Sequence, residues 1–359
     1  MSIWRWADWI GPVEESARIT LGEGNTPLVH SRSIGPAAGL EKLFFKIETS
    51  NPSGSYKDRF AAAAIANMIT GRQTTCVATS SGNTGAALAA YCAAAKIRCR
   101  IAVVETAPDA KLQQMLAYGA EIVRVKGFGT DAAVTDTVFE QLRKLASRAG
   151  SALQISAYAY SPLGMAGVES ISFELGEQHV GRLHHVFCPA GGGGLTLAVA
   201  RGFAKLRENG HSDQGPAIHC VQPEGNDTIA GALRAGDKAR NVECTSMISG
   251  LQVATVIDGN EVIRECRPTG GTGHLVTDQA VWVVQKRLAR EEGIFCEPAG
   301  AVALAGALKA HANGEFASSE SVVCLITGSG FKDSTSIHRM NSESSVPIVA
   351  ADELCESWT

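Results

Sequence analysis

The chain has 359 residues, of which 45% are hydrophobic, 19% charged and 6% aromatic, and it contains 38 glycines. This composition is typical of a globular protein, and the length suggests about two domains. The 32 basic residues stand against 36 acidic ones, which gives a net charge of −4. Because the sequence shows no basic stripe or tail, we expect no nucleic-acid partner.

Residues 73–95 form the longest stretch without a charge, but polar residues around Gly82 interrupt it, and the N-terminus lacks an apolar signal core. We therefore expect no membrane segment and a cytoplasmic location. The ten cysteines are scattered, mostly within apolar runs, and none forms a CxxC pair. We expect them to be reduced and to pack as small hydrophobic residues. The histidines show no metal-ligand spacing, so we expect no metal site.

Seven short apolar runs have the length and composition of buried strands. They lie at residues 43–47, 74–79, 100–104, 121–125, 185–188, 217–221 and 321–326. Segments with helical periodicity lie between them, including 111–118 and 277–292, and Thr277 and Gly293 bound the second of these. This alternation predicts an α/β fold with parallel sheets covered by helices on both faces. In such sheets ligands bind beyond the carboxyl ends of the strands.

The first motif at a strand end is Ser53-Gly54-Ser55-Tyr56-Lys57-Asp58-Arg59. It places Lys57 in the first turn of an alanine-rich helix, where the helix dipole disfavours a cation. Such a position lowers the pKa of an amine, as a nucleophilic or Schiff-base lysine requires. The alternative is a surface lysine that pairs with Asp58.

The second motif, at residues 79–85, comprises hydroxyl, amide and glycine residues between a strand and a helix. It includes Ser80, Ser81, Gly82, Asn83 and Thr84. Hydroxyls and backbone N–H groups that converge at a helix N-terminus suit a carboxylate or phosphate. The alternative is simple capping of the helix, which needs only one such residue.

The third motif is four consecutive glycines, Gly191, Gly192, Gly193 and Gly194, between a strand and a helix. Backbone N–H groups in such a loop can close around a phosphate, although a flexible loop is the alternative. A separate segment, residues 127–132, fits G-x-G-x-x-A and keeps a nicotinamide-dependent dehydrogenase as a rival. No strand that ends in an acidic residue follows it at the required spacing.

Taken with residues 21–28, 291–298 and 327–333, these motifs resemble, in this order, the pyridoxal-phosphate enzymes of the tryptophan-synthase-β family, fold type II. The nearest resemblance is to threonine synthases, and it runs from about Leu21 to Asp333. It implies two α/β domains whose parallel-rich sheets are covered by helices. The larger domain would comprise residues 1–55 and 160–345, the smaller 56–159, and residues 346–359 would form a C-terminal extension.

The resemblance also implies a role for each motif. Lys57 would form the Schiff base with pyridoxal 5'-phosphate and later move protons at the substrate. Asn83 would bind the ring hydroxyl of the cofactor, and Thr327 would face its pyridine nitrogen. The four-glycine loop would wrap the cofactor phosphate. The residues expected to hold the substrate carboxylate are Ser80, Ser81, Gly82 and Thr84.

A neutral hydroxyl at Thr327 cannot keep the pyridine nitrogen protonated, which favours elimination and replacement over transamination. The expected activity is that of a threonine-synthase-like lyase that catalyses elimination or replacement at the β or γ carbon of an amino acid, with threonine synthase itself as the leading candidate. The four-glycine loop resembles serine/threonine dehydratases more closely. A β-replacement synthase and a silent cofactor-binding regulator are further alternatives. The family resemblance also suggests a homodimer.

One segment departs from the threonine-synthase pattern. Residues 156–170, where the family carries an arginine-containing phosphate-binding stretch, contain no Arg or Lys. Glu169 stands near the expected lysine, and an uncompensated acid would repel a phosphate. We therefore expect intact cofactor machinery and an altered leaving-group pocket.

Overall fold

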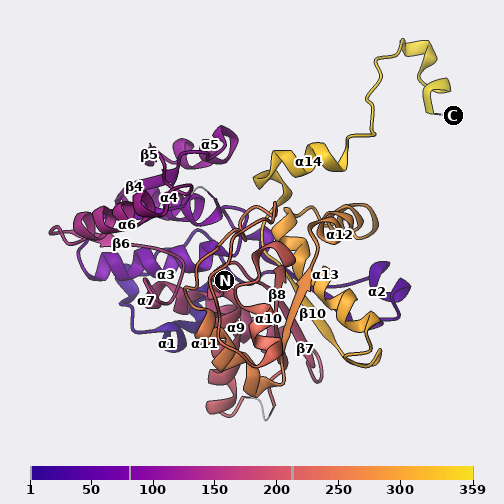
Figure 1. Cartoon of the computed structure of the whole chain (residues 1–359), viewed down its shortest axis with the longest axis horizontal. Coiled ribbons are helices and arrows are strands. Elements are labelled where there is room, and N and C mark those ends of the chain that lie inside the picture. The colour runs from indigo at the N-terminus through magenta and orange to yellow at the C-terminus, as the bar shows by residue number, and fades with distance from the viewer. Residues whose placement is uncertain (1, 81, 212–213, 359) are drawn as a thin grey trace.

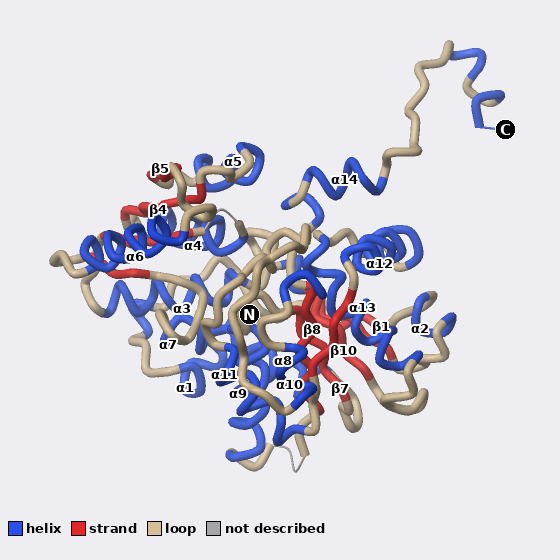
Figure 2. Tube along the Cα trace, viewed as in Figure 1, coloured by secondary structure: helices blue, strands red, loops and turns tan. Residues whose placement is uncertain are grey.

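The computed structural model describes residues 2–80, 82–211 and 214–358, which form two sheets flanked by helices (Figure 2). The strands are β1 (Leu28–His30), β2 (Leu43–Ile47), β3 (Thr75–Thr79), β4 (Arg98–Val104), β5 (Glu121–Val125), β6 (Ser151–Leu153), β7 (His185–Pro189), β8 (Ala217–Pro223), β9 (Gly273–Val276) and β10 (Val322–Ile326). One sheet has the order β1-β2-β10-β7-β8-β9 and the other β5-β4-β3-β6. All neighbouring pairs are parallel except β1 with β2.

The α-helices occupy most of the segments between the strands (Figure 1). They are α1 (Ala7–Ile10), α2 (Ile34–Ala37), α3 (Lys57–Thr70), α4 (Asn83–Ala95), α5 (Asp109–Ala117), α6 (Ala132–Ala146), α7 (Pro162–Ala166), α8 (Ser170–Gln178), α9 (Gly194–Glu208), α10 (Ala230–Ala235), α11 (Gly259–Cys266), α12 (Asp278–Glu291), α13 (Pro298–Ala312) and α14 (Ser334–Met340). The predicted α/β fold class is confirmed.

Each of the seven strands predicted from apolar runs is present, with ends that differ by at most two residues. The strands that the prediction missed, β1, β6 and β9, are three or four residues long and lie at sheet edges. An edge strand is covered on fewer sides than a central one, so its sequence carries a weaker apolar signal. In the interior of the six-stranded sheet, the strand β10 is buried along its whole length.

Alternate residues of the central strands enter different hydrophobic clusters on the two faces of the six-stranded sheet. In β10, Val323 and Leu325 join the cluster that includes α8, α9 and α11, whereas Cys324 packs on the other face with α12 and α13. Because side chains alternate along a strand, a strand that is buried on both faces must be apolar throughout. This explains why continuous hydrophobic runs in the sequence predict these strands.

Each sheet has a point where the strand order reverses direction. In the four-stranded sheet it lies between β3 and β6, and in the six-stranded sheet between β7 and β10. Loops that leave the carboxyl ends of such neighbouring strands diverge, which opens a crevice for ligands. The motifs at residues 79–85, 191–194 and 327–333 follow β3, β7 and β10 respectively, so they border these two crevices.

Beyond α14 the chain leaves the body of the molecule and ends in an extended arm (Figure 1). The arm exposes Val346, Ile348 and Trp358. The strands of the four-stranded sheet all fall within residues 56–159, but the domain boundaries stated above stay a prediction. Among the described residues, no helix has the length and apolar character needed to span a bilayer.

Candidate active site

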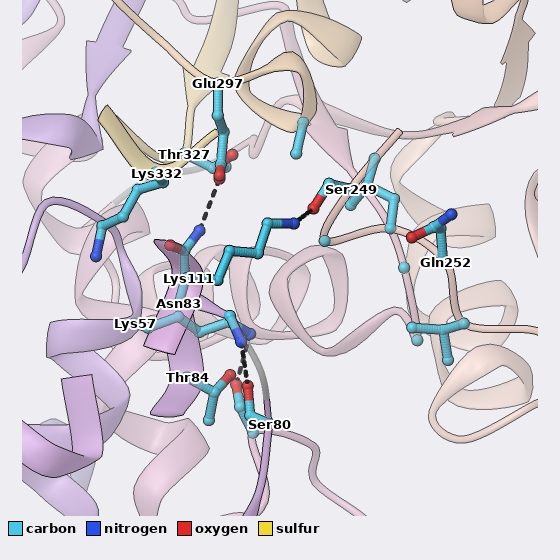
Figure 3. Close-up of a pocket in the computed structure, with 18 of the residues that line it drawn as sticks. Lys57, Ser80, Asn83, Thr84, Lys111, Ser249, Gln252, Glu297, Thr327 and Lys332 are labelled. Atoms are coloured by element: carbon cyan, nitrogen blue, oxygen red, sulfur yellow. Dashed lines mark hydrogen bonds between the residues drawn. The ribbon is translucent and has the colours of Figure 1, made fainter. Parts of the chain in front are cut away.

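A cavity of about 880 Å³ is lined by residues from both sheets at their reversal points (Figure 3). It brings together the described residues that the sequence singled out, which are Lys57, Ser80, Gly82, Asn83, Thr84, Gly191, Gly192, Gly193, Gly194 and Thr327. Ser81, the remaining predicted residue, lies outside the described residues. The motifs are therefore spatial neighbours, although more than 200 residues separate Asn83 from Thr327 in the chain.

Lys57 is the first residue of α3, as predicted, and its amine faces the cavity. Lys57 Nζ donates a hydrogen bond to Ser156 Oγ at 2.7 Å. Burial lowers the pKa of Lys57 to about 7, although the charges of Asp258 and Glu297 oppose this shift. A substantial fraction of the amine is thus neutral and nucleophilic near neutral pH. The sequence analysis attributed a lowered pKa of Lys57 to the helix dipole, whereas the largest cause in the structure is burial.

The alternative in which Lys57 pairs with Asp58 is not the arrangement found. Asp58 is buried, and its Oδ2 accepts a hydrogen bond from the backbone N–H of Ser53 at 2.9 Å. This bond ties the start of α3 to the loop before it. Asp58 thereby helps to set the position of Lys57 instead of neutralising its charge.

Arg59 anchors α3 two residues beyond Lys57. Its guanidinium is fully buried and donates to Glu48 Oε2 at 2.8 Å and to Glu174 Oε1 at 2.6 Å. Burial alone would raise the pKa of Glu174, but Arg59 and Lys46 together hold it at about 2. Paired charges with this many hydrogen bonds fix the first turn of the helix firmly. The lysine is therefore carried on a rigid element.

The loop that follows β3 leads directly into α4, whose N-cap is Gly82. Gly82 has no side chain with which to cap, and its backbone N–H donates to Ser80 Oγ at 3.2 Å. Ser80 and Thr84, the latter in the first turn of α4, both line the cavity and lie side by side in Figure 3. A helix N-terminus that opens on a cavity favours an anion, so the geometry suits a carboxylate.

Asn83 contacts a residue that the sequence analysis did not assign to the site. Its Nδ2 donates to Glu297 Oε1 at 2.6 Å, and burial raises the pKa of Glu297 to about 7. Glu297 is the N-cap of α13 and immediately precedes Pro298. Both residues belong to the motif at residues 291–298, to which the sequence analysis gave no role in the site.

The four-glycine loop has the shape needed to hold a phosphate group. Gly193 has a φ of +93°, and a Cβ added there would lie 2.8 Å from Val262 Cγ2. A Cβ on Gly194 would lie 3.1 Å from the methyl carbon of Met165. At Gly193 the positive φ and the close contact require glycine, and α9 begins at Gly194 with its N-terminus at the cavity. The loop thus fits a cofactor phosphate.

Thr327 directly follows β10, and its backbone carbonyl accepts a hydrogen bond from the Tyr56 N–H at 3.0 Å. This bond joins the end of β10 to the residue before Lys57. In Figure 3 Thr327 lies beside Glu297, across the cavity from Ser80 and Thr84. The strand, the loop and α3 therefore meet around one space that could hold a planar ring.

Two further lysines line the cavity, and neither was predicted as a site residue. Lys111 in α5 donates to Ser249 Oγ, and Lys332 donates to Gln114 Oε1 at 2.5 Å. Burial lowers the pKa of Lys332, although nearby Glu297 and Asp58 oppose this. Both lysines belong to segments that the sequence analysis had already selected, but nothing in their local pattern indicated where their side chains would point.

The segment that departs from the threonine-synthase pattern contributes Ser156 and Ala157 to the cavity lining. Glu169 is not among the lining residues, so the expected repulsion by an uncompensated acid is wrong. It is 3% exposed, accepts a hydrogen bond from Tyr158 Oη at 2.7 Å and forms an ion pair with Lys205 at 2.5 Å.

Three buried cysteines also meet away from the cavity: Cys76 in β3, Cys92 in α4 and Cys99 in β4 have sulfurs within 4.8 Å of one another. All three belong to the same large apolar cluster as α8, α9 and α11. Their spacing in the sequence matches no metal-binding pattern. The expectation of no metal site stays a prediction.

Comparison with known proteins identifies the class. Residues 19–328 match the family model described as "Pyridoxal-phosphate dependent enzyme", so the chain belongs to this family. The resemblance noted in the sequence, the fold type and the cofactor are thereby confirmed, and the nicotinamide-dependent alternative is wrong.

Within the family, the chain is a lyase similar to threonine synthases. Threonine synthase of Methanocaldococcus jannaschii is 30% identical over 351 residues, which cover 96% of this chain and 84% of that protein. Serine racemase from Dictyostelium discoideum has a TM-score of 0.70 and 26% identity, and the match covers 86% of this chain and 92% of that one. The T.th. threonine deaminase has a TM-score of 0.71 and 25% identity, with coverage of 85% and 92%.

Proposed function

We propose that the cavity is the active site and that Lys57 carries the cofactor. The observation that supports this most strongly is a buried amine with a pKa of about 7 that shares one cavity with a phosphate-sized glycine loop. In this proposal the cofactor is held by Asn83, Gly191, Gly192, Gly193, Gly194 and Thr327. The substrate carboxylate is held by Ser80, Ser81, Gly82 and Thr84.

The bound cofactor withdraws electron density from the α-carbon of the amino acid, which makes its proton removable. Lys57 is placed to take that proton, and Ser156 orients the amine through its hydrogen bond. The Thr327 hydroxyl offers a neutral partner to the ring nitrogen, so charge remains nearer the substrate. This favours loss of a leaving group from the β or γ carbon over transfer of the amino group.

The activity we propose is that of threonine synthase, in which water replaces the phosphate of O-phosphohomoserine to give threonine and phosphate. Its support is the similarity to threonine synthases over most of the chain. The second candidate is a serine/threonine dehydratase, which the four-glycine loop and the likeness to the T.th. threonine deaminase favour. A β-replacement synthase is a third candidate, and the intact Lys57 argues against a silent regulator.

An absorbance spectrum followed by amino-acid titration tests the proposal. The purified protein should show a band near ~410 nm, which lysine-bound cofactor produces. Lys57→Ala should abolish both the band and turnover, whereas the surface control Lys144→Gln should retain them. O-phosphohomoserine that yields equimolar threonine and phosphate supports threonine synthase. Turnover of serine or threonine to an oxo acid and ammonia, with none of O-phosphohomoserine, would identify a dehydratase instead.

We also propose a cytoplasmic homodimer with the two-domain division described above. The cytoplasmic location is supported by cysteines that are unpaired throughout the described residues, as a reducing compartment requires. The dimer is supported by the family resemblance, and light scattering of the full chain tests it.

A further inference from the structure

Asp258 is a buried acid that joins two of the loops around the cavity. It is the N-cap of α11, is 2% exposed and is not among the described residues that line the cavity. Its carboxylate accepts hydrogen bonds from the backbone N–H groups of Tyr158, at 2.8 Å, and Ala159, at 3.0 Å. Its own backbone N–H donates to the Gly192 carbonyl at 3.2 Å. Asp258 therefore ties the loop that follows β6 to the four-glycine loop.

The carboxylate of Asp258 is turned away from its own helix. An aspartate at an N-cap ordinarily accepts hydrogen bonds from the first N–H groups of the helix that it begins. Among the described residues, Asp258 makes no such side-chain bond to α11, and both of its oxygens accept from the loop instead. Because hydrogen bonds to an ionised acceptor are the stronger ones, this side chain largely sets the position of the loop.

The loop held in this way carries the hydrogen-bond partner of Lys57. Ser156 lies two residues before Tyr158, and its Oγ accepts from Lys57 Nζ at 2.7 Å. The Ala157 carbonyl accepts a hydrogen bond from the Ser161 N–H at 2.9 Å, which closes the loop into a turn. A displacement at Tyr158 is therefore passed on to Ser156.

Asp258 and Ser156 also pack against the same point of the four-glycine loop. A Cβ added at Gly194 would lie 3.3 Å from Asp258 Oδ2 and 3.3 Å from the Ser156 carbonyl oxygen. These contacts fix how far Ser156 lies from the loop that we expect to hold the cofactor phosphate. One cofactor molecule has to reach both this loop and the Lys57 amine, and a misplacement of about 1 Å near reacting groups is costly.

We infer that Asp258 is a positioning residue, which holds Ser156 against the Lys57 amine by tying the loop after β6 to the four-glycine loop. This inference deepens the proposed function and rests on it, because it takes Lys57 to carry the cofactor and to move the substrate proton. Asp258 contacts neither the cofactor nor the substrate and acts through the loop alone. Its effect on the Lys57 amine should therefore disappear when residue 156 has no hydroxyl.

Two single substitutions and their combination test this coupling in apo protein. Pyridoxal 5'-phosphate is added, and the rate constant for the appearance of the band near ~410 nm is measured. Asp258→Asn keeps the size of the side chain but replaces one acceptor oxygen by a donor, which faces a backbone N–H. Ser156→Ala should slow incorporation about tenfold and Asp258→Asn about threefold to tenfold. The double variant should be at most about twofold slower than Ser156→Ala. The control Glu265→Gln, a solvent-accessible acid on the same helix, should leave the rate within about twofold of the parent.

Rate losses that multiply in the double variant would overturn the inference, because a merely structural effect of Asp258 adds to that of Ser156. An Asp258→Asn rate that equals the parent rate would overturn it as well. Urea unfolding shows whether the variants are folded. If Asp258→Asn does not fold, Asp258→Glu takes its place, since it keeps both acceptor oxygens but sets them one methylene further out, and the same coupling is expected.

Hydrogen exchange separates this inference from the proposed function, because it needs no cofactor. The amides of residues 155–161 should exchange at least about tenfold faster in apo Asp258→Asn than in the apo parent. Unchanged exchange would overturn the role of Asp258 even if the cofactor band forms. A parent protein that forms no band contradicts the proposed function, whereas the exchange result still decides whether Asp258 holds the loop.

Discussion

Asn83 Nδ2 lies 2.6 Å from Glu297 Oε1, and this hydrogen bond joins the first turn of α4 to the N-cap of α13. The two residues are 214 positions apart in the chain. Their contact connects the four-stranded sheet to the six-stranded sheet across the cavity. Because Glu297 is buried with a pKa of about 7, the strength of this link depends on pH in the neutral range.

Gly328 leaves room for this hydrogen bond. A Cβ added at Gly328 would lie 2.1 Å from Glu297 Oε1 and 3.0 Å from Asn83 Nδ2. We predict that Gly328→Ala displaces both side chains and lowers kcat/KM by about 100-fold, as a 1 Å misplacement near reacting groups can do. Steady-state kinetics and the cofactor absorbance of purified protein measure this. In the control Gly215→Ala, the added methyl would lie 3.7 Å from Phe203, so activity should be unchanged. A Gly328→Ala enzyme within twofold of the parent would contradict the prediction.

The low pKa of Lys57 predicts how the apo protein takes up its cofactor. An aldehyde reacts with the neutral amine, whose fraction rises as pH increases through about 7 and is nearly complete about two pH units higher. The rate of pyridoxal-phosphate incorporation should therefore rise between about pH 6 and pH 8 and then level off. Stopped-flow absorbance near ~410 nm follows this rate. A rate that still climbs tenfold per unit above about pH 8 would indicate an ordinary lysine pKa and contradict the structure.

The sequence predicted the loops of the site better than it predicted their contacts. A buried strand that is followed by glycine or hydroxyl residues and then a helix is a local pattern, so Lys57, Asn83 and the four-glycine loop could be found. The partner of Lys57 could not, because Ser156 follows the edge strand β6, which is only three residues long. Contacts between distant segments depend on how the two sheets face each other, and no local pattern encodes that arrangement.

The same contrast between local patterns and long-range contacts applies to the interior of the fold. Continuous apolar runs predicted strands such as β7 and β10, because both faces of a central parallel strand are buried. The position of Lys111 could not be predicted in this way. Helical periodicity identifies the buried face of α5 through Leu112 and Met115, but it leaves open what the adjoining face contacts.

The buried charge network around Arg59 predicts a large loss of stability on substitution. Arg59→Met leaves Glu48 and Glu174 buried without their main partner, and unpaired buried charges cost about 3–5 kcal/mol. Urea unfolding of apo protein, monitored by circular dichroism, measures this free energy. Arg98→Met provides the control, because its ion pair with Glu121 is more than half exposed on both sides and should contribute less than about 1 kcal/mol. Similar effects of the two substitutions would contradict the role we assign to Arg59.

Three neighbouring strands carry a hydrogen-bonded chain of histidines. The His185 and His219 rings are joined at 3.0 Å, and His219 and His274 also at 3.0 Å. Arg234 can only donate, so its contact at 3.1 Å makes His274 Nδ1 an acceptor and leaves the proton on Nε2. Both hydrogen bonds between the rings can then form with all three rings neutral, and burial lowers the pKa of each, to about 4 for His274.

A histidine whose pKa is lower in the folded than in the unfolded state makes folding less favourable as pH falls. Below about pH 6.5 the unfolded chain binds a proton at His274, whereas the folded chain does not until about pH 4. We predict that His274 alone removes ~2 kcal/mol of the free energy of unfolding between about pH 7.5 and pH 5. Urea unfolding of the parent and of His274→Gln at these two pH values tests this. The variant should be less stable at the higher pH and should lose less on acidification. Because carboxylates remote from residue 274 titrate alike in both proteins, an identical loss in the two would show that His274 is not held neutral by the fold.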